Sequence, residues 1–335
     1  MSIVLNSLSI LCSFATIAGI AYLYAHKRDQ ADRVSFRITF VIAWVDILFA
    51  LFSILAYTQG KNGNFCVFLA WGTLWTDLSF IFLNVIIAFN LQIVFLHGCK
   101  NIRHFERYFI SGSFLAATLI ATAPTIAKKL GFDPVHPQNC WFIEMNSQST
   151  LLWEWLSQHI WIVLTTSYLL IISLCTIIKL ARQSRRILGP VDIYDSQTQN
   201  AKHLINLAVR RIVLYPMVPI LTHGLKIAYM TTQYTGREFP YFMRIVGLGL
   251  LSSQGVFNSI VFLFDPALQS TWRRKKIQRK SVFVFNEHRD STVMYGDKKS
   301  TLEIAHIPHS HSHSRSHSYS HSHSSPLSAD CIKQL

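Results

Sequence analysis

Long apolar runs recur along this sequence, and each is long enough to cross a lipid bilayer as a helix. The hydrocarbon core of a bilayer, about 30 Å thick, requires about 20 apolar residues at the rise of an α-helix. The runs are too long for barrel strands, and a helix satisfies every backbone polar group within its own segment. We therefore predict an all-α membrane protein, a seven-transmembrane helix bundle. The predicted spans are Ile3–Ala25, Ile38–Tyr57, Val67–Leu96, Tyr108–Ile126, Leu156–Ile178, Ile212–Met230 and Phe242–Phe264.

The distribution of basic residues predicts how the bundle is oriented. Up to residue 280, the segments after the first, third, fifth and seventh runs hold 20 Lys and Arg residues, whereas the other three connecting segments hold 4. Basic residues gather on the cytoplasmic side, so we expect the N-terminus outside and the C-terminal segment inside. The net charge of +14 then reflects topology and attraction to anionic membrane lipid, and a nucleic-acid partner is not expected. The chain is predicted to be a multi-pass protein of the plasma membrane.

Three segments differ in composition. Residues 1–266 form the predicted seven-transmembrane domain. In 267–280, Leu268 and Trp272 lie one helical turn apart beside basic residues, which is typical of an amphipathic juxtamembrane helix; a basic stop-transfer segment without structure is the alternative. Residues 281–335 form a Ser/His-rich cytoplasmic tail that we expect to be disordered and open to kinases. Its histidines also allow weak metal binding, but without a fixed scaffold no metal site is defined.

Two cysteines lie on the predicted outer side. Cys66 begins the third span and Cys140 lies in the second outer loop, where a disulfide is feasible and two free thiols are the alternative. The bond would tether the loop Ala127–Trp155 over the top of the third span. We expect no large outer domain, so a ligand would meet the outer loops or a cavity between the helices.

Polar residues at membrane depth are expensive, which makes them candidates for function or for paired structural roles. Asp46, Asn84 and Asn258 fall at similar depth in the second, third and seventh spans. They could form one interhelical network that acts either as a conformational switch or as polar contacts that hold the helices together. Pro216 and Pro219 kink the sixth span, and such a kink is either a hinge or an ordinary feature of membrane helices.

Several candidates for ligand binding lie nearer the outside. Asp77 follows Trp71 and Trp75 on the third span, and either a ligand-facing role or core packing would explain them. On the sixth span, His223 and Lys226 share a face that could bind an anionic ligand, but the favoured interpretation is that Lys226 extends to the outer headgroups. The same two interpretations apply to Arg244 at the start of the seventh span. Catalytic and cofactor motifs are missing from the sequence, so we expect neither an enzyme, nor a cofactor, nor a bound metal.

Together these features resemble a G-protein-coupled receptor over about residues 1–280. The motifs of the rhodopsin-like class are missing, because the third span ends in NLQIVFL (residues 90–96) and the seventh lacks the Asn-Pro-x-x-Tyr motif. The segments RRIVLYPMVP (210–219), NCW (139–141) and SQGVFNSIVFLFDP (253–266) are similar to the cyclic-AMP-receptor-like receptors of fungi and slime moulds, which are distantly secretin-like. The resemblance implies that Cys66 and Cys140 correspond to the disulfide of that family. The Arg-Arg and Tyr-Pro elements of this chain match the pattern of the family's sixth helix.

The resemblance implies coupling to a heterotrimeric G protein and modulation of adenylate cyclase. We expect a small extracellular molecule or nutrient to favour one packing of the helices and so to open an inner cleft for the G protein. Cyclic AMP itself is not assumed to be the ligand. The candidate G-protein contacts are the basic residues Lys100, Arg103, Arg185, Arg186, Arg210 and Arg211.

Two other classes share parts of this pattern. A seven-helix transporter would show internal repeats or paired broken helices, and no repeat is evident. A light-responsive protein of microbial type would carry a lysine in the seventh span for its retinal Schiff base, and none lies between Phe242 and Phe264. A receptor is therefore the favoured function.

Overall fold

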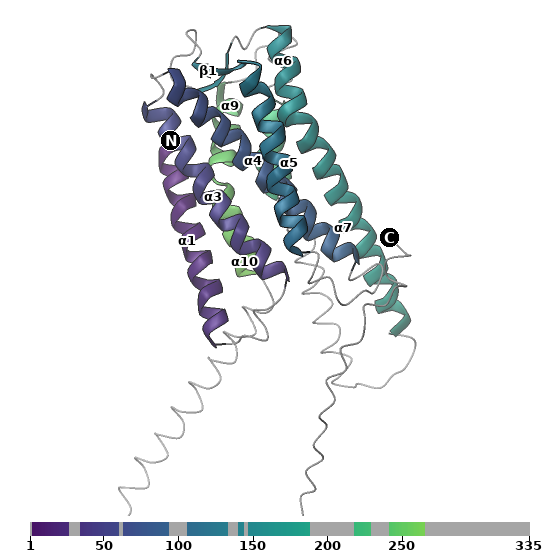
Figure 1. The fold of residues 1–335 in the computed structure, drawn as a ribbon. Coiled ribbons are helices and arrows are strands. Elements are labelled where there is room, and N and C mark those ends of the chain that lie inside the picture. Colours follow the sequence, from purple (N-terminus) through teal and green to yellow (C-terminus); the bar gives the residue numbers. More distant parts are fainter. Residues whose placement is uncertain are drawn as a thin grey trace, which may run out of the picture. The chain divides into compact units, whose positions relative to one another are not determined.

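The computed structural model describes residues 2–26, 34–59, 63–93, 106–132, 140–143, 147–187, 218–228 and 241–264. All of them belong to the first of two units into which the chain divides, Met1–Gln269 and Ser270–Leu335. Within this unit, long helices lie side by side (Figure 1). The helices that cross most of the bundle are α1 (Ser2–His26), α3 (Val34–Gln59), α4 (Gly63–Leu91), α5 (Glu106–Ile126) and α7 (Ile160–Ile187).

Among the described residues, five helices are long and apolar enough to cross a membrane, and a bent helix pair makes six if it counts as one span. The chain is therefore a multi-span helical membrane protein, as predicted. Residues 218–228 of the predicted sixth span are also helical, and the rest of that span lies outside the described part of the chain. The count of seven spans stays a prediction.

Helix α4 is the central helix of the described bundle. It packs against α3, α5 and α7, and it is the most buried of the candidate spans. Large apolar side chains on the other helices remain exposed because this surface faces lipid rather than water. Examples are Leu11, Leu115 and Ile171. The burial of polar residues on α4 is therefore informative, since lipid offers them no partner.

A small β-hairpin follows α5. The helix ends in a Schellman motif, in which Lys129 N–H donates to the carbonyl of Pro124 at 2.9 Å and Lys128 N–H to that of Thr125 at 3.0 Å. Lys128 adopts the left-handed conformation at φ 52°, which turns the chain sharply. Strand β1 (Leu130–Phe132) then pairs antiparallel with β2 (Cys140–Phe142), with Gly131 opposite Trp141.

The helix after the hairpin contains a π-helical segment. It begins as α6 (Gln148–Glu154), continues as the π-helix η2 (Trp155–His159) and runs on into α7. A π-segment inserts an extra residue into the helical repeat and shifts which side chains face inward. Here Ser157, Gln158 and His159, all within the π-segment, are buried in succession.

The seventh predicted span is broken at Ser253. Helices α9 (Tyr241–Ser252) and α10 (Gln254–Leu263) meet at a bend of 51°. The hydroxyl of Ser253 donates to the carbonyl of Leu250 at 2.9 Å, so its side chain takes part in the local backbone hydrogen bonding at the bend.

Candidate functional site

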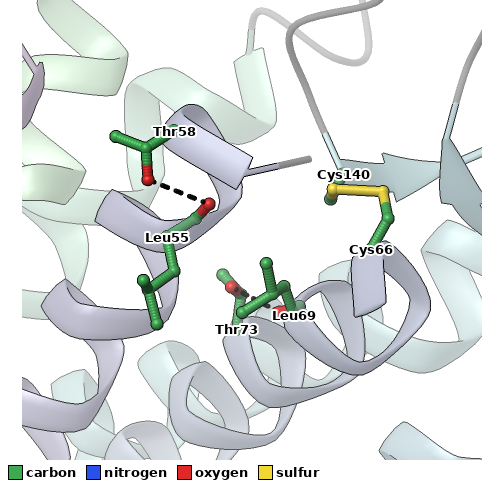
Figure 2. The surroundings of a disulfide bond; sticks show 6 residues. All are labelled: Leu55, Thr58, Cys66, Leu69, Thr73 and Cys140. Atoms are coloured by element: carbon green, nitrogen blue, oxygen red, sulfur yellow. Dashed lines mark hydrogen bonds between the residues drawn. A yellow bond between two sulfur atoms is a disulfide. The ribbon is translucent and has the colours of Figure 1, made fainter. Parts of the chain in front are cut away.

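The predicted disulfide between Cys66 and Cys140 is confirmed. It joins the first turn of α4 to strand β2, with the two Cα atoms 5.1 Å apart (Figure 2). Nearby, the hydroxyl of Thr73 donates to the carbonyl of Leu69 at 2.9 Å, so this polar group on α4 is satisfied within its own helix. The bond fixes the hairpin to the end of α4, and the residue after Cys140 is Trp141.

A group of buried polar residues lies between α4, η2 and residues 218–228. Asp77 on α4 is 1% exposed and accepts a hydrogen bond at Oδ2 from Nε2 of Gln158 on η2. Its other oxygen, Oδ1, lies 3.5 Å from Nε2 of His223. Three separate segments thus meet at one carboxylate inside the bundle.

A second carboxylate adjoins the first. Glu154, the last residue of α6, lies with Oε1 3.7 Å from Nε2 of His159 and accepts a hydrogen bond at 3.2 Å from the indole Nε1 of Trp141. The ammonium of Lys226 lies over the same indole ring, 4.7 Å from its centroid, and is attracted by the charges of both Asp77 and Glu154. Trp141 therefore connects the disulfide-bound hairpin to a carboxylate, that of Glu154, and to an ammonium group, that of Lys226.

We refer to these buried residues as the Asp77 cluster. Charged groups at membrane depth need opposite charges or hydrogen bonds nearby, and the cluster supplies both. The π-segment is what brings two of its members inward, because it places Gln158 and His159 on the buried side together. The cluster consists of Asp77, Glu154, Gln158, His159, His223 and Lys226.

The environment of Lys226 differs from one of the sequence expectations. Its side chain is 7% exposed and lies inside the bundle rather than extending to lipid headgroups. The reason is local: the two carboxylates and the indole face of Trp141 stabilise the ammonium there.

Trp71 and Trp75 face α5 rather than the Asp77 cluster. Their indole N–H groups donate to Thr122 at 3.2 Å and to Thr118 at 2.9 Å. The two rings also stack on one another, with centroids 5.9 Å apart. Both tryptophans therefore hold α4 and α5 together. This agrees with the interpretation that they serve helix packing.

A second buried polar group, the Asp46 cluster, consists of Asp46, Gln254, Asn258 and Ser9. Asp46 on α3 accepts hydrogen bonds from Gln254 at 2.8 Å and from Asn258 at 2.7 Å, both on α10. Ser9 on α1 accepts a hydrogen bond from the backbone N–H of Gly255 at 2.9 Å. The carboxylate and the serine thus lie at the first turns of α10, where an anion and hydrogen-bond acceptors are favourable.

The other predicted network member, Asn84, has a different partner. Its side-chain amide donates to the carbonyl of Phe80, one turn earlier in α4, at 2.8 Å. Pro219 lies in the first turn of the described stretch 218–228, where the hydroxyl of Thr222 donates to the carbonyl of Val218 at 2.9 Å. The structure therefore brings together Asp46 and Asn258 but not the whole predicted set.

An ion pair lies near the opposite end of the bundle from the hairpin. Arg37, in the first turns of α3, lies 3.1 Å from the carboxylate of Glu106, the first residue of α5. Glu106 is buried, so this contact ties two helix ends that sequence order predicts to be cytoplasmic.

Sequence reasoning missed six residues of these sites. Glu154 was outside the predicted fifth span, and the inward direction of Gln158 and His159 depends on a π-segment that hydropathy does not reveal. An acidic and a histidine side chain in an otherwise apolar segment were the available signal. The missed residues are Ser9, Trp141, Glu154, Gln158, His159 and Gln254.

Several predicted site residues cannot be placed. Lys100, Arg103, Arg210, Arg211 and Pro216 lie outside the described residues, as do the segments 267–280 and 281–335. Arg185 and Arg186 lie on α7 and Arg244 lies on α9, but their side chains are outside the described part of the structure.

The described residues contain no group of three His, Cys, Asp or Glu side chains arranged to hold a metal ion. No protein-family model matches the chain, and no curated protein matches it. The function therefore has to be argued from the two buried polar clusters and the predicted topology.

Proposed function

We propose that the chain is a G-protein-coupled receptor that transmits an extracellular small-molecule signal across the plasma membrane. The observation that carries this proposal is the position of Trp141. This residue follows the disulfide cysteine of the hairpin and contacts Glu154 and Lys226 of the Asp77 cluster. A ligand that arrives from the hairpin side would change contacts shared by α4, η2 and residues 218–228.

A change at the Asp77 cluster has a direct mechanical consequence for residues 218–228. Two members of the cluster, His223 and Lys226, lie on this stretch, and Pro219 lies one turn before them. A ligand that prefers one arrangement of Asp77 and His223 biases the position of the whole stretch, because a ligand shifts an equilibrium by its differential affinity for the two states. Residues 210–219 precede this stretch on the side predicted to face the G protein.

The Asp46 cluster provides the second element of the proposed mechanism. It joins α1, α3 and α10 at the bend between α9 and α10. Hydrogen bonds across a bent span can hold one packing until a neighbouring helix moves. The switch function of Asp46, Asn84, Pro216, Pro219 and Asn258 is accordingly proposed to centre on Asp46 and Asn258.

The family and partners belong to the same proposal. The motifs in 139–141, 210–219 and 253–266 favour the cyclic-AMP-receptor-like family. In this proposal the predicted sixth span, which contains residues 218–228, brings the number of spans to seven. The partners would be a heterotrimeric G protein that modulates adenylate cyclase, membrane lipid and kinases acting on the tail. The proposed G-protein contacts are Lys100, Arg103, Arg185, Arg186, Arg210 and Arg211.

The test is guanine-nucleotide exchange by purified Gα subunits with the reconstituted full-length chain. Reversing Arg210 and Arg211 to Glu is expected to abolish exchange without reducing surface expression. The matched control reverses Lys128 and Lys129, a basic pair beside the hairpin, which should leave basal exchange unchanged. Equal exchange by the Arg210→Glu/Arg211→Glu variant and the parent chain would contradict the proposed contact of these residues with the G protein.

A transporter is the second candidate, and the bend between α9 and α10 favours it. Broken helices with buried polar groups beside the break are typical of substrate and ion sites in transporters. Counterflow of labelled sugars or amino acids in proteoliposomes tests this function. Flux that depends on Asp46, together with no nucleotide exchange on any Gα, would replace the receptor proposal.

A further inference from the structure

We propose that the Asp77 cluster binds a small organic molecule through a primary ammonium group. This inference rests on the proposed function only in that the ligand reaches the cluster from the hairpin side. It names the chemical class of the ligand, which the topology and the motifs leave open.

The first observation is a set of buried acceptor atoms. Asp77 Oδ1 and Gln158 Oε1 are fully buried and have no hydrogen-bond partner among the described residues. A carboxylate oxygen and an amide oxygen can only accept hydrogen bonds, and leaving such atoms unpaired in a buried site is costly. What completes this part of the cluster is therefore a donor.

The second observation concerns the two imidazole rings beside these oxygens. Neither nitrogen of His223 or His159 has a hydrogen-bond partner among the described residues, although His223 Nε2 lies 3.5 Å from Asp77 Oδ1. Ring contacts hold both: His223 packs against Phe80 with centroids 6.2 Å apart, and His159 against Trp155 at 5.4 Å. Each neutral imidazole offers one donor and one acceptor, so acceptors outnumber donors among these unpartnered atoms.

An ammonium group fits this surplus. It brings three N–H donors and a positive charge, which suit the Asp77 carboxylate, the Gln158 amide oxygen and one imidazole nitrogen together. A quaternary ammonium would lack the donors, and a neutral hydroxyl would lack the charge.

Lys226 defines the other boundary of the site. Its ammonium lies over the indole ring of Trp141, is attracted by the charges of both Asp77 and Glu154, and repels a second cation. The ligand is therefore expected to carry one positive charge and an uncharged remainder. An anionic ligand, the other chemistry that His223 and Lys226 suggest, would meet the charges of Asp77 and Glu154 within the same cluster.

The experiment uses the full-length chain in detergent micelles and paired probes that differ only in the charged group. Tyramine is compared with tyrosol, and ethanolamine with ethylene glycol, by calorimetric titration and by the midpoint of thermal unfolding. The amines are expected to bind and to raise the midpoint, whereas the hydroxyl analogues do neither. Equal effects of tyramine and tyrosol, or no binding by either amine, would overturn the proposal.

Variants locate the site. Asp77→Asn should weaken amine binding about 10- to 100-fold, because a charge-assisted hydrogen bond is lost. Gln158→Leu should weaken it less, and it keeps the test decisive if Asp77→Asn does not fold. Lys226→Met should retain binding or tighten it, since it removes a like charge. The control is Glu106→Gln, which changes a carboxylate in the ion pair with Arg37, away from the cluster.

Four further outcomes are decisive. Loss of tyramine binding in Lys226→Met with retention in Asp77→Asn would overturn the proposed contact between the amine and Asp77. If lowering the pH by itself stabilises the chain and abolishes the response to amines, a proton on one of the imidazoles supplies the donor and the positive charge instead of the ligand. Amine binding without nucleotide exchange would support the amine site and contradict the receptor proposal. Nucleotide exchange without amine binding would support the receptor proposal and contradict the amine site.

Discussion

The backbone N–H of Gly255 donates a hydrogen bond to the hydroxyl of Ser9 at 2.9 Å, which joins the first turn of α10 to the middle of α1. The two helices approach so closely that a Cβ atom at position 255 would lie 2.4 Å from Ser9 Oγ and 3.0 Å from the Ser9 carbonyl oxygen. Glycine is required here for the contact and not for a turn.

Gly255→Ala should therefore destabilise the chain. The added methyl group must separate α1 from α10 or break the hydrogen bond, and overpacking of this kind costs about 1–3 kcal/mol. Thermal unfolding in detergent measures the effect. The matched control is Gly112→Ala on α5, where a Cβ meets nothing within 4 Å and where alanine should be neutral or stabilising. Similar midpoints for both variants would contradict the predicted close approach.

Asp46→Asn should loosen the contact between α3 and α10. The carboxylate accepts from both Gln254 and Asn258, whereas an asparagine there faces two amide donors with one acceptor oxygen. A loss of about 1–3 kcal/mol in stability is expected for the unpaired group. If Asp46 is a switch, basal nucleotide exchange rises in the folded fraction; if it only holds the helices together, the yield of folded chain falls and basal exchange per molecule does not change.

Trp141→Phe should separate the two contacts of the hairpin with the Asp77 cluster. Phenylalanine keeps an aromatic face for Lys226 but removes the indole N–H that donates to Glu154 at 3.2 Å. A hydrogen bond to a charged group contributes about 1.5–3 kcal/mol. A double-mutant cycle with Glu154→Gln measures the coupling by thermal unfolding. Strictly additive effects of the two substitutions would show that the hydrogen bond contributes nothing to stability.

Lys128→Gly should stabilise the turn between α5 and the hairpin. Lys128 adopts φ 52° at the end of the Schellman motif, and left-handed backbone costs a non-glycine residue about 1–2 kcal/mol. The neighbouring Lys129→Gly gives no such relief and loses the hydrogen bond from Nζ to Ser149 at 3.1 Å. The unfolding midpoint should rise for position 128 and fall or stay constant for position 129. The opposite order would contradict the assigned turn.

Hydropathy was sufficient to place the spans because lipid forces backbone polar groups into helices wherever a run is long and apolar. Five of the predicted spans correspond to described helices that pass the length and hydropathy test, and the seventh to the bent pair α9–α10. The bend at Ser253 was not predicted. A serine in an apolar run is compatible with a straight helix, and only the packing of α10 against α1 and α3 selects the break.

Roles of side chains were harder to predict than spans. Trp71 and Trp75 precede Asp77 on α4 by six and two residues; their indoles bond to α5, whereas Asp77 faces η2 and residues 218–228. Helical spacing says which residues share a face but not which neighbour that face meets. The neighbour depends on how the helices are arranged around α4.

The amino-acid sequence by itself determined the membrane environment and the helical class, because both follow from the cost of exposing polar backbone to lipid, and it made Cys66 and Cys140 candidates for a disulfide. Tertiary structure alone decided that Glu154, Gln158 and His159 join Asp77. The physical reason is that the π-segment places Gln158 and His159 on the buried side together, where Gln158 donates to the carboxylate of Asp77 on α4 and His159 lies beside Glu154.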